Sequence, residues 1–302
     1  MEVKVFVESV QVASEEAGDR QLADHDVRRA AWRIRRRALD MIAREGFGYL
    51  GQALSAAEIF AALYVDVLKA TDDLVVSPGH YAIVHYGAGV EVNRISADEL
   101  ETYGVDGSSL ESIGTEHTPG LSATCGSLGQ GLSVAAGLAL GARLKQEDKF
   151  VYALISDGEM EEGQTWEAAL FSAHHELNNL VVLLDRNDSQ VDGPTHQVTT
   201  LEPVPDKWAA FGWDVQAVDG HDVAELRRAL RAAAEADRPS VIIAETWTLS
   251  GLDHLLPDEA DGHFLKVSPE QVEAARAHLD QAERDALRVA SAPWSKRVGG
   301  VA

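Results

Sequence analysis

Short apolar runs alternate with segments of helical periodicity between residues 150 and 246, and this alternation constrains the fold more than any other feature. The runs are rich in β-branched residues and are too short to be helices. Because polar residues do not alternate within them, we expect strands buried on both faces of a parallel sheet. The fold class is therefore predicted to be α/β, a doubly wound parallel sheet with helices on both faces. The predicted strands are 73–77, 150–156, 180–186, 213–218 and 240–246.

Helices are predicted where apolar residues recur every three or four positions. Asp24 is expected to cap the first helix, which ends at Gly46 and Gly48, and Ser55 is expected to cap the second. Residues 104–131 hold seven glycines and are predicted to form a loop. The other predicted helices are 132–145, 163–177, 222–236 and 269–290.

The composition limits the partners of the chain. A net charge of −23 over 302 residues argues against nucleic acid and against anionic membrane surfaces, which both need a basic face. No stretch approaches the roughly 20 apolar residues of a transmembrane helix. Cys125 is the only cysteine, and no signal peptide is apparent, so we expect a cytoplasmic protein. The predicted organisation is an arm (1–23), one domain (24–290) and a tail (291–302).

Two polar residues follow predicted strands and suggest a metal site. Asp157 ends the strand at 150–156, and Asn187 ends the strand at 180–186. If these strands are neighbours, both side chains lie at the carboxyl edge of the sheet, where ligands of such folds bind. One carboxylate, one amide oxygen and a backbone carbonyl, that of Ser189, leave room for substrate phosphates on Mg²⁺. The carboxylate can thus bind a cation, which in turn binds a diphosphate.

The segment SDGEMEEGQTW, followed by Asn187, resembles the thiamine diphosphate motif in its transketolase form. The interval from Asp157 to Asn187 is 187 − 157 = 30 residues. Further similar stretches follow in the family's order along residues 24–285: LSAAEIFAALY, SPGH, TPGLSATCGSLGQGLSVAAGLA, FGWDVQAVDGHDVAEL and HFLK. The resemblance implies the diphosphate-binding (PP-type) domain of the thiamine diphosphate fold, with thiamine diphosphate and Mg²⁺ as cofactors.

The resemblance also implies roles for individual residues. Asp157, Asn187 and the Ser189 carbonyl would bind Mg²⁺. Catalytic roles would fall to His80 and His263, near the diphosphate or the reacting centre, and to Glu162, in an acidic network that links sites across a dimer. The other implied cofactor-binding residues are Gly126, Ser127, Leu128, Gly158 and Glu159, and His80 and Asn187 count among them too.

The substrate-facing part departs from the family pattern. The Gly-His at the end of the first helix corresponds to Gly48–Tyr49 here, so a phenol replaces an imidazole. The family's Gly-His-Pro is absent, and His117 in ESIGTEHTPG is a candidate for its role. Tyr49 and His117 are therefore predicted to face the substrate, and the donor need not be an ordinary pentose phosphate.

The resemblance covers only the N-terminal half of a transketolase and lacks the half that carries the cofactor-activating glutamate. It implies the first subunit of a split enzyme, active with a C-terminal (pyrimidine-binding) subunit in an α2β2 tetramer. The leading hypothesis is transfer of a two-carbon ketol unit from a ketose or 2-oxo donor. One alternative is a subunit like that of pyruvate dehydrogenase, which passes a glycolyl or acyl unit to a lipoyl or carrier-protein thiol. The other is a non-catalytic scaffold.

Overall fold

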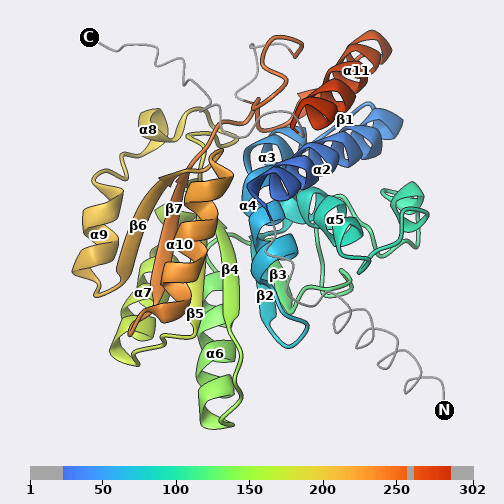
Figure 1. Ribbon diagram of the computed structural model, residues 1–302. Coiled ribbons are helices and arrows are strands. Elements are labelled where there is room, and N and C mark those ends of the chain that lie inside the picture. Colours follow the sequence, from blue (N-terminus) through green and yellow to red (C-terminus); the bar gives the residue numbers. More distant parts are fainter. Residues whose placement is uncertain (1–22, 257–261, 287–302) are drawn as a thin grey trace, which may run out of the picture.

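The computed structural model describes residues 23–256 and 262–286. Its centre is a parallel sheet in the order β3-β2-β4-β5-β7-β6, with helices against both faces (Figure 1). The predicted α/β fold with a doubly wound parallel sheet is therefore confirmed. The strands are β2 (Asp73–Pro78), β3 (Ala123–Cys125), β4 (Val151–Ser156), β5 (Leu180–Arg186), β6 (Asp214–Asp219) and β7 (Ser240–Glu245).

The two faces of the sheet bury two separate apolar clusters. On β4, Tyr152 and Leu154 belong to one cluster, whereas Val151 and Ile155 belong to the other. This division follows from the alternation of side chains along a strand. The first cluster is covered by α2 (Asp24–Glu45), α3 (Leu50–Ser55), α4 (Ala57–Ala62), α5 (Ala82–Glu91), α10 (Val223–Glu235) and α11 (Pro269–Ala286). The second is covered by α6 (Gly131–Leu144), α7 (Gly163–His174) and α9 (Val204–Ala210).

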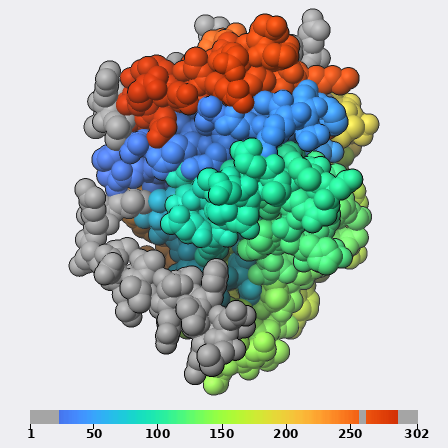
Figure 2. Space-filling model, turned by 90° about the vertical axis from the view of Figure 1, so that its right-hand side faces the viewer, coloured from blue at the N-terminus to red at the C-terminus, as the bar shows by residue number. Residues whose placement is uncertain are grey.

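Helix α11 packs along α2 at the outside of the molecule (Figure 2). Arg29 and Arg33 of α2 both pair with Glu283 of α11, and Arg36 pairs with Asp280. Three arginines of the first predicted helix therefore hold α11 against α2.

Three expectations about local structure are wrong. Helix α2 begins after Ala23, so Asp24 lies in its first turn and pairs with Arg227 instead of capping. Ser55 does not cap a helix either, because α3 begins at Leu50 and Ser55 is its last residue. The glycine-rich stretch 104–131 contains β3, which pairs with β2 through Val75 and Ala123. Helix α5 is an addition to the predicted elements, since its two glycines and uniformly apolar sequence hide the helical period.

Some predictions lie outside the described residues. These are the arm except for residue 23, the tail at 291–302, and residues 287–290 of the last predicted helix. Among the helices that are described, none combines the length and the apolar character required to cross a bilayer.

A small second sheet brings distant parts of the chain to the carboxyl end of β2. Strand β1 (Phe47–Gly48) pairs antiparallel with β8 (Leu265–Lys266). The short helix η2 (Gly79–Tyr81) follows β2 directly. As a result, the residues just after β1, just before β8 and just after β2 lie together at one edge of the main sheet.

Candidate functional site

The strands that carry Asp157 and Asn187 are neighbours. Strands β4 and β5 pair in parallel, with Ser156 opposite Asp185, so the residues that follow meet at the carboxyl edge. Asp157 Oδ2 accepts a hydrogen bond from the backbone N–H of Asp188 at 2.7 Å, and Oδ1 accepts from Gly158 at 2.8 Å. Asp157 and Asn187 are 2% and 4% exposed. The structure thus places both predicted ligands in one buried position, and metal binding by them stays a prediction.

Asp185, which is not among the predicted site residues, orients the Asn187 side chain. Its fully buried carboxylate accepts hydrogen bonds from Asn187 Nδ2 at 3.0 Å and Tyr81 Oη at 2.7 Å. Ser55 Oγ (2.6 Å) and Thr246 Oγ1 donate to it as well. Because the amide nitrogen of Asn187 is bound to Asp185, its Oδ1 atom points away from Asp185 and accepts a hydrogen bond from the Ser189 N–H at 3.0 Å. An acidic residue inside the apolar run LVVLLDR is the sequence signal for this role.

The electrostatics of this position favour a cation. Burial, together with the nearby Asp185 carboxylate, raises the pKa of Asp157 to about 7. A divalent ion would hold the carboxylate ionised. No group of three or more His, Cys, Asp or Glu side chains suited to a metal occurs in the described ranges. The predicted set has a single carboxylate plus an amide and the carbonyl of the buried Ser189, and such a set suits Mg²⁺ that also binds phosphate oxygens.

A second buried carboxylate holds the glycine-rich loop that precedes α6. Glu159 Oε1 accepts from the backbone N–H of Gly129 at 2.7 Å and from Ser77 Oγ, which in turn accepts from Gly131 N–H at 3.0 Å. Burial raises the pKa of Glu159 to about 7. The loop residues Gly126 and Ser127 are exposed, and Leu128 is half-buried. Glu159 therefore lies beneath the loop and holds it, and cofactor binding by Glu159 stays a prediction.

Three rings gather where β1, β2 and β8 meet. The centroid of the Tyr49 ring lies 5.1 Å from that of His80 and 5.8 Å from that of His263, and the two imidazoles are 5.0 Å apart. Burial and the neighbouring His263 lower the pKa of His80 to about 3, so His80 is neutral at physiological pH. Three sequence-predicted residues that are far apart in the chain are thus brought together. Gln52, which no sequence motif singles out, contacts His263 at 2.8 Å.

Two predicted residues lie at the surface. Glu162 is exposed at the start of α7. His117 is also largely exposed, in the loop before β3, where it pairs with its neighbour Glu116 at 3.8 Å. Neither one takes part in the buried clusters described above, and their roles stay predictions.

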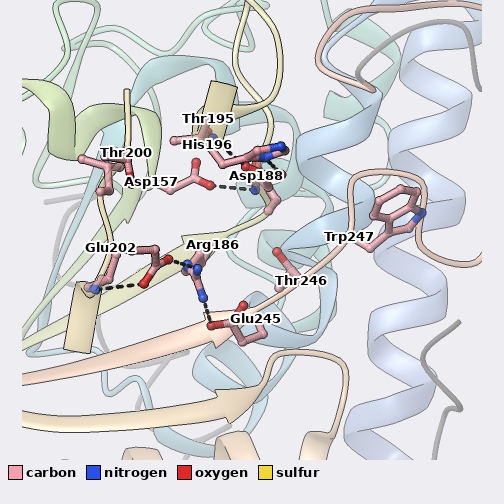
Figure 3. Close-up of a pocket in the computed structure, with 13 residues that line it drawn as sticks. Asp157, Arg186, Asp188, Thr195, His196, Thr200, Glu202, Glu245, Thr246 and Trp247 are labelled. Atoms are coloured by element: carbon pink, nitrogen blue, oxygen red, sulfur yellow. Dashed lines mark hydrogen bonds and ion pairs between the residues drawn. The ribbon is translucent and has the colours of Figure 1, made fainter. Parts of the chain in front are cut away.

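A cavity of about 370 Å³ opens beside Asp157 over the ends of β5 and β7 (Figure 3). Arg186 at its wall pairs with both Glu202 and Glu245. Trp247 forms another part of the wall and is about half exposed. The opening gives a ligand access to Asp157 from the solvent side.

Comparison with known proteins now identifies the family. The sequence profile described as "Transketolase, thiamine diphosphate binding domain" matches residues 27–291. The chain therefore belongs to the transketolase family and contains its thiamine diphosphate binding domain. It is similar in fold to the transketolase of Campylobacter jejuni, with a TM-score of 0.77 at 24% identity over 87% of this chain and 46% of that one.

Its curated relatives include proteins of similar extent. The chain is 42% identical over 253 residues to the transketolase family protein y4mO of Sinorhizobium fredii, covering 80% of this chain and 90% of the relative. It is 36% identical over 267 residues to the 6-deoxy-6-sulfo-D-fructose transketolase subunit SqwG of a Clostridium species (85% and 97%). An apulose-4-phosphate transketolase subunit of Phocaeicola vulgatus is 31% identical over 260 residues (83% and 92%). These findings confirm the prediction of a transketolase-family transferase subunit and favour it over the two alternatives.

Proposed function

We propose that this chain is the N-terminal subunit of a two-component transketolase that binds thiamine diphosphate through Mg²⁺ and transfers a two-carbon ketol unit. The observation that carries the proposal is the pair formed by Asp157 and Asn187. A buried carboxylate with a raised pKa and an amide that Asp185 orients follow neighbouring parallel strands and line the same cavity. Two of the relatives described above are transketolase subunits of nearly the same length, which supports a split enzyme.

The residues fit the cofactor and the metal. Asp157 and Asn187 would bind Mg²⁺ with the Ser189 carbonyl, while Gly158, His80 and His263 would contact the diphosphate. When bound, thiamine diphosphate supplies the nucleophilic carbon that accepts a two-carbon unit from a ketose and passes it to an acceptor. The ring-binding surface would be formed by Gly126, Ser127 and Leu128, with Glu159 holding this loop in place.

The remaining polar residues act on the substrate. His80, neutral because of its low pKa, can donate or accept a hydrogen bond but does not repel a cation. Tyr49 lies against His80 and His263, so its hydroxyl can replace the imidazole that the family pattern has there. His117 completes the proposed substrate contacts from the loop before β3. A phenol at position 49 favours a ketose donor other than an ordinary pentose phosphate.

A second subunit would complete the site. Helices α6 and α7 pack together and expose Val134, Leu144, Leu170 and Phe171, which we call the α6–α7 face. We assign this apolar face to contacts within an α2β2 tetramer, in which Glu162 would reach the acidic groups of another subunit. Residues 24–290 would form the single cofactor-binding domain. The lone Cys125 fits a reducing cytoplasm.

The test is calorimetry of the chain, assembled with its C-terminal partner subunit, against Mg²⁺ and thiamine diphosphate. We expect saturable binding that Asp157→Asn abolishes. Asp188→Asn, which removes an exposed carboxylate next to the site, should keep the affinity and serves as the matched control. If both variants still bind the cofactor with Mg²⁺, the predicted ligand set is wrong.

A donor screen with the same pair separates the transketolase from its runner-up. The screen should include the ketoses for which the two relatives are named, 6-deoxy-6-sulfo-D-fructose and apulose 4-phosphate. We expect turnover with an aldose acceptor and none by the chain without its partner. Transfer only to a lipoyl or carrier-protein thiol would favour the dehydrogenase-like alternative.

A further inference from the structure

The side chain of Gln52 lies against one ring nitrogen of His263. Gln52 belongs to α3 and is 1% exposed, and its Nε2 atom is 2.8 Å from His263 Nδ1. The two backbones that carry these residues touch. A Cβ atom on Gly51 would lie 1.7 Å from the carbonyl oxygen of Gly262, so only glycine at position 51 permits this approach. The contact between Gln52 and His263 is therefore built into the packing of α3 against the chain before β8.

The chemistry of the amide determines which nitrogen of His263 carries the proton. An amide nitrogen only donates, so Nδ1 must be the bare acceptor and the proton of a neutral ring lies on Nε2. The reverse amide orientation would place Gln52 Oε1 against Nδ1 and leave the NH₂ group without this acceptor. In the observed orientation Oε1 is the unpaired atom. The tautomer of His263 therefore follows from the contact of the amide nitrogen with Nδ1.

We infer that Gln52 is a positioning residue that fixes His263 in the Nε2–H form. In that form the N–H donor of the ring is Nε2, on the edge turned away from Gln52. Such a donor suits an oxygen acceptor, either a phosphate oxygen or a hydroxyl of the ketose. The inference deepens the proposed function and rests on it, because it states in which form His263 meets its ligand.

The rings of His80 and Tyr49 flank His263. His80 lies 5.0 Å away, centroid to centroid, and Tyr49 presents its ring edge-on at 5.8 Å. Burial keeps the pKa of His80 near 3, so His80 adds no positive charge.

The tautomer can be measured directly by nitrogen-15 NMR of the full chain labelled at histidine. Protonated and bare ring nitrogens have widely separated shifts, and two-bond correlations to the ring hydrogens assign them. Spectra are recorded above about pH 8, past the ordinary imidazole pKa of about 6.5. His263→Asn identifies the His263 signals. We expect a protonated Nε2 and a bare Nδ1 in the wild-type chain, whereas a protonated Nδ1 would overturn the inference without any further variant.

Two substitutions of Gln52 test the cause. In Gln52→Glu the carboxylate can only accept, so the proton should move to Nδ1. Gln52→Met removes the donor at similar length, and both tautomers should then be populated. An unchanged His263 spectrum in Gln52→Glu would contradict a positioning role for Gln52.

His85 is an internal control in the same spectra. Its Nε2 lies 2.8 Å from the carbonyl oxygen of Pro119, which can only accept, so His85 is also an Nε2–H ring. Its signals should be unchanged in both variants if the fold is intact.

The NMR measurement needs neither cofactor nor partner, so its failure is distinct from a failure of the proposed function. In the assembled pair, Gln52→Glu should weaken cofactor or donor binding about tenfold, because the hydrogen bond from Nε2–H is lost.

Discussion

The amide nitrogen of Asn187 lies 3.0 Å from the buried carboxylate of Asp185, two residues earlier on the same strand end. Both groups are covered by the packing of α3 and of the chain after β7, from which Ser55 and Thr246 also donate to Asp185. The orientation of a predicted metal ligand is thus determined by residues behind it. Residues that hydrogen-bond to a metal ligand commonly have a strong effect on metal affinity, although they do not touch the metal themselves.

Replacing Asp185 should weaken both the fold and the site. Asp185→Ala leaves Ser55, Tyr81 and Thr246 without their acceptor, which should lower the free energy of unfolding by about 3 kcal/mol. It should also lower the affinity of the assembled pair for Mg²⁺ with thiamine diphosphate by roughly 10- to 100-fold. Urea unfolding and calorimetry measure the two effects. Thr246→Val removes one donor and keeps the carboxylate, so it should retain most of the affinity, and equal losses in both variants would argue against orientation by Asp185.

A pH dependence of stability should arise from His85. Its buried ring bridges Tyr64 and Pro119, and burial lowers its pKa to about 4. The unfolded imidazole takes up a proton near pH 6.5, so between about 6.5 and 4 the unfolded state binds more protons and stability falls as the pH falls. Relative to His85→Gln, the wild-type chain should lose up to ~3 kcal/mol over this range. Urea unfolding at several pH values gives the difference.

A matched variant isolates this effect. His117→Gln makes the same substitution at an imidazole that is largely exposed, and it serves as the control at each pH. Carboxylates that titrate in the same range contribute equally to all three proteins and cancel. Parallel profiles for His85→Gln and the wild type would mean that His85 is protonated as easily in the folded protein as in the unfolded chain.

The third prediction concerns the loop that Glu159 holds. Glu159→Ala removes the acceptor for Gly129 N–H and Ser77 Oγ, which should cost about 2 kcal/mol of stability and speed hydrogen exchange in residues 126–131. Glu159→Gln keeps an oxygen at the same place and should leave the loop protected. Exchange followed by mass spectrometry distinguishes the two. Equal protection in Glu159→Ala and the wild type would show that other contacts hold the loop.

The sheet and the strand ends of the site could be predicted from the sequence. Continuous apolar runs identify buried parallel strands. Because Asp157 and Asn187 directly follow two of these runs in the sequence, both residues are placed at one edge of the sheet without knowledge of packing. The prediction assumes that the two strands are neighbours, and β4 and β5 do pair, with Ser156 opposite Asp185. Topology was sufficient here because the residues directly follow paired strands.

The contacts behind the site could not be predicted, because they depend on packing between segments without a shared pattern. Ser55 is 130 residues from Asp185, and Gln52 is 211 residues from His263. A serine before an apolar periodic run usually caps a helix, which is why Ser55 is predicted to do so. Tertiary packing overrides that preference, because α3 begins earlier and turns the hydroxyl toward Asp185. Strand β3 escapes prediction for a similar reason, as only its pairing with β2 makes ATC a strand.

The α6–α7 face is a prominent exposed apolar feature of the second helix layer. Leu144 is 77% and Leu170 60% exposed, and both lie on helices whose opposite sides pack on the sheet. Gln164 of α7 donates to Ser133 of α6 at 3.2 Å, which joins the two helices near their N-terminal ends. Exposed apolar side chains on adjoining helices are typical of a contact between subunits.

A charge on this face should prevent assembly without affecting the fold. Leu170→Glu should change the free energy of unfolding of the isolated chain by no more than about 0.5 kcal/mol, because the side chain is already solvated. Light scattering after size-exclusion chromatography should then show that the variant no longer forms the complex with its partner subunit. Val105→Glu, an equally exposed apolar residue in the loop after α5, should assemble like the wild type. Normal assembly of Leu170→Glu would place the subunit contact elsewhere on the molecule.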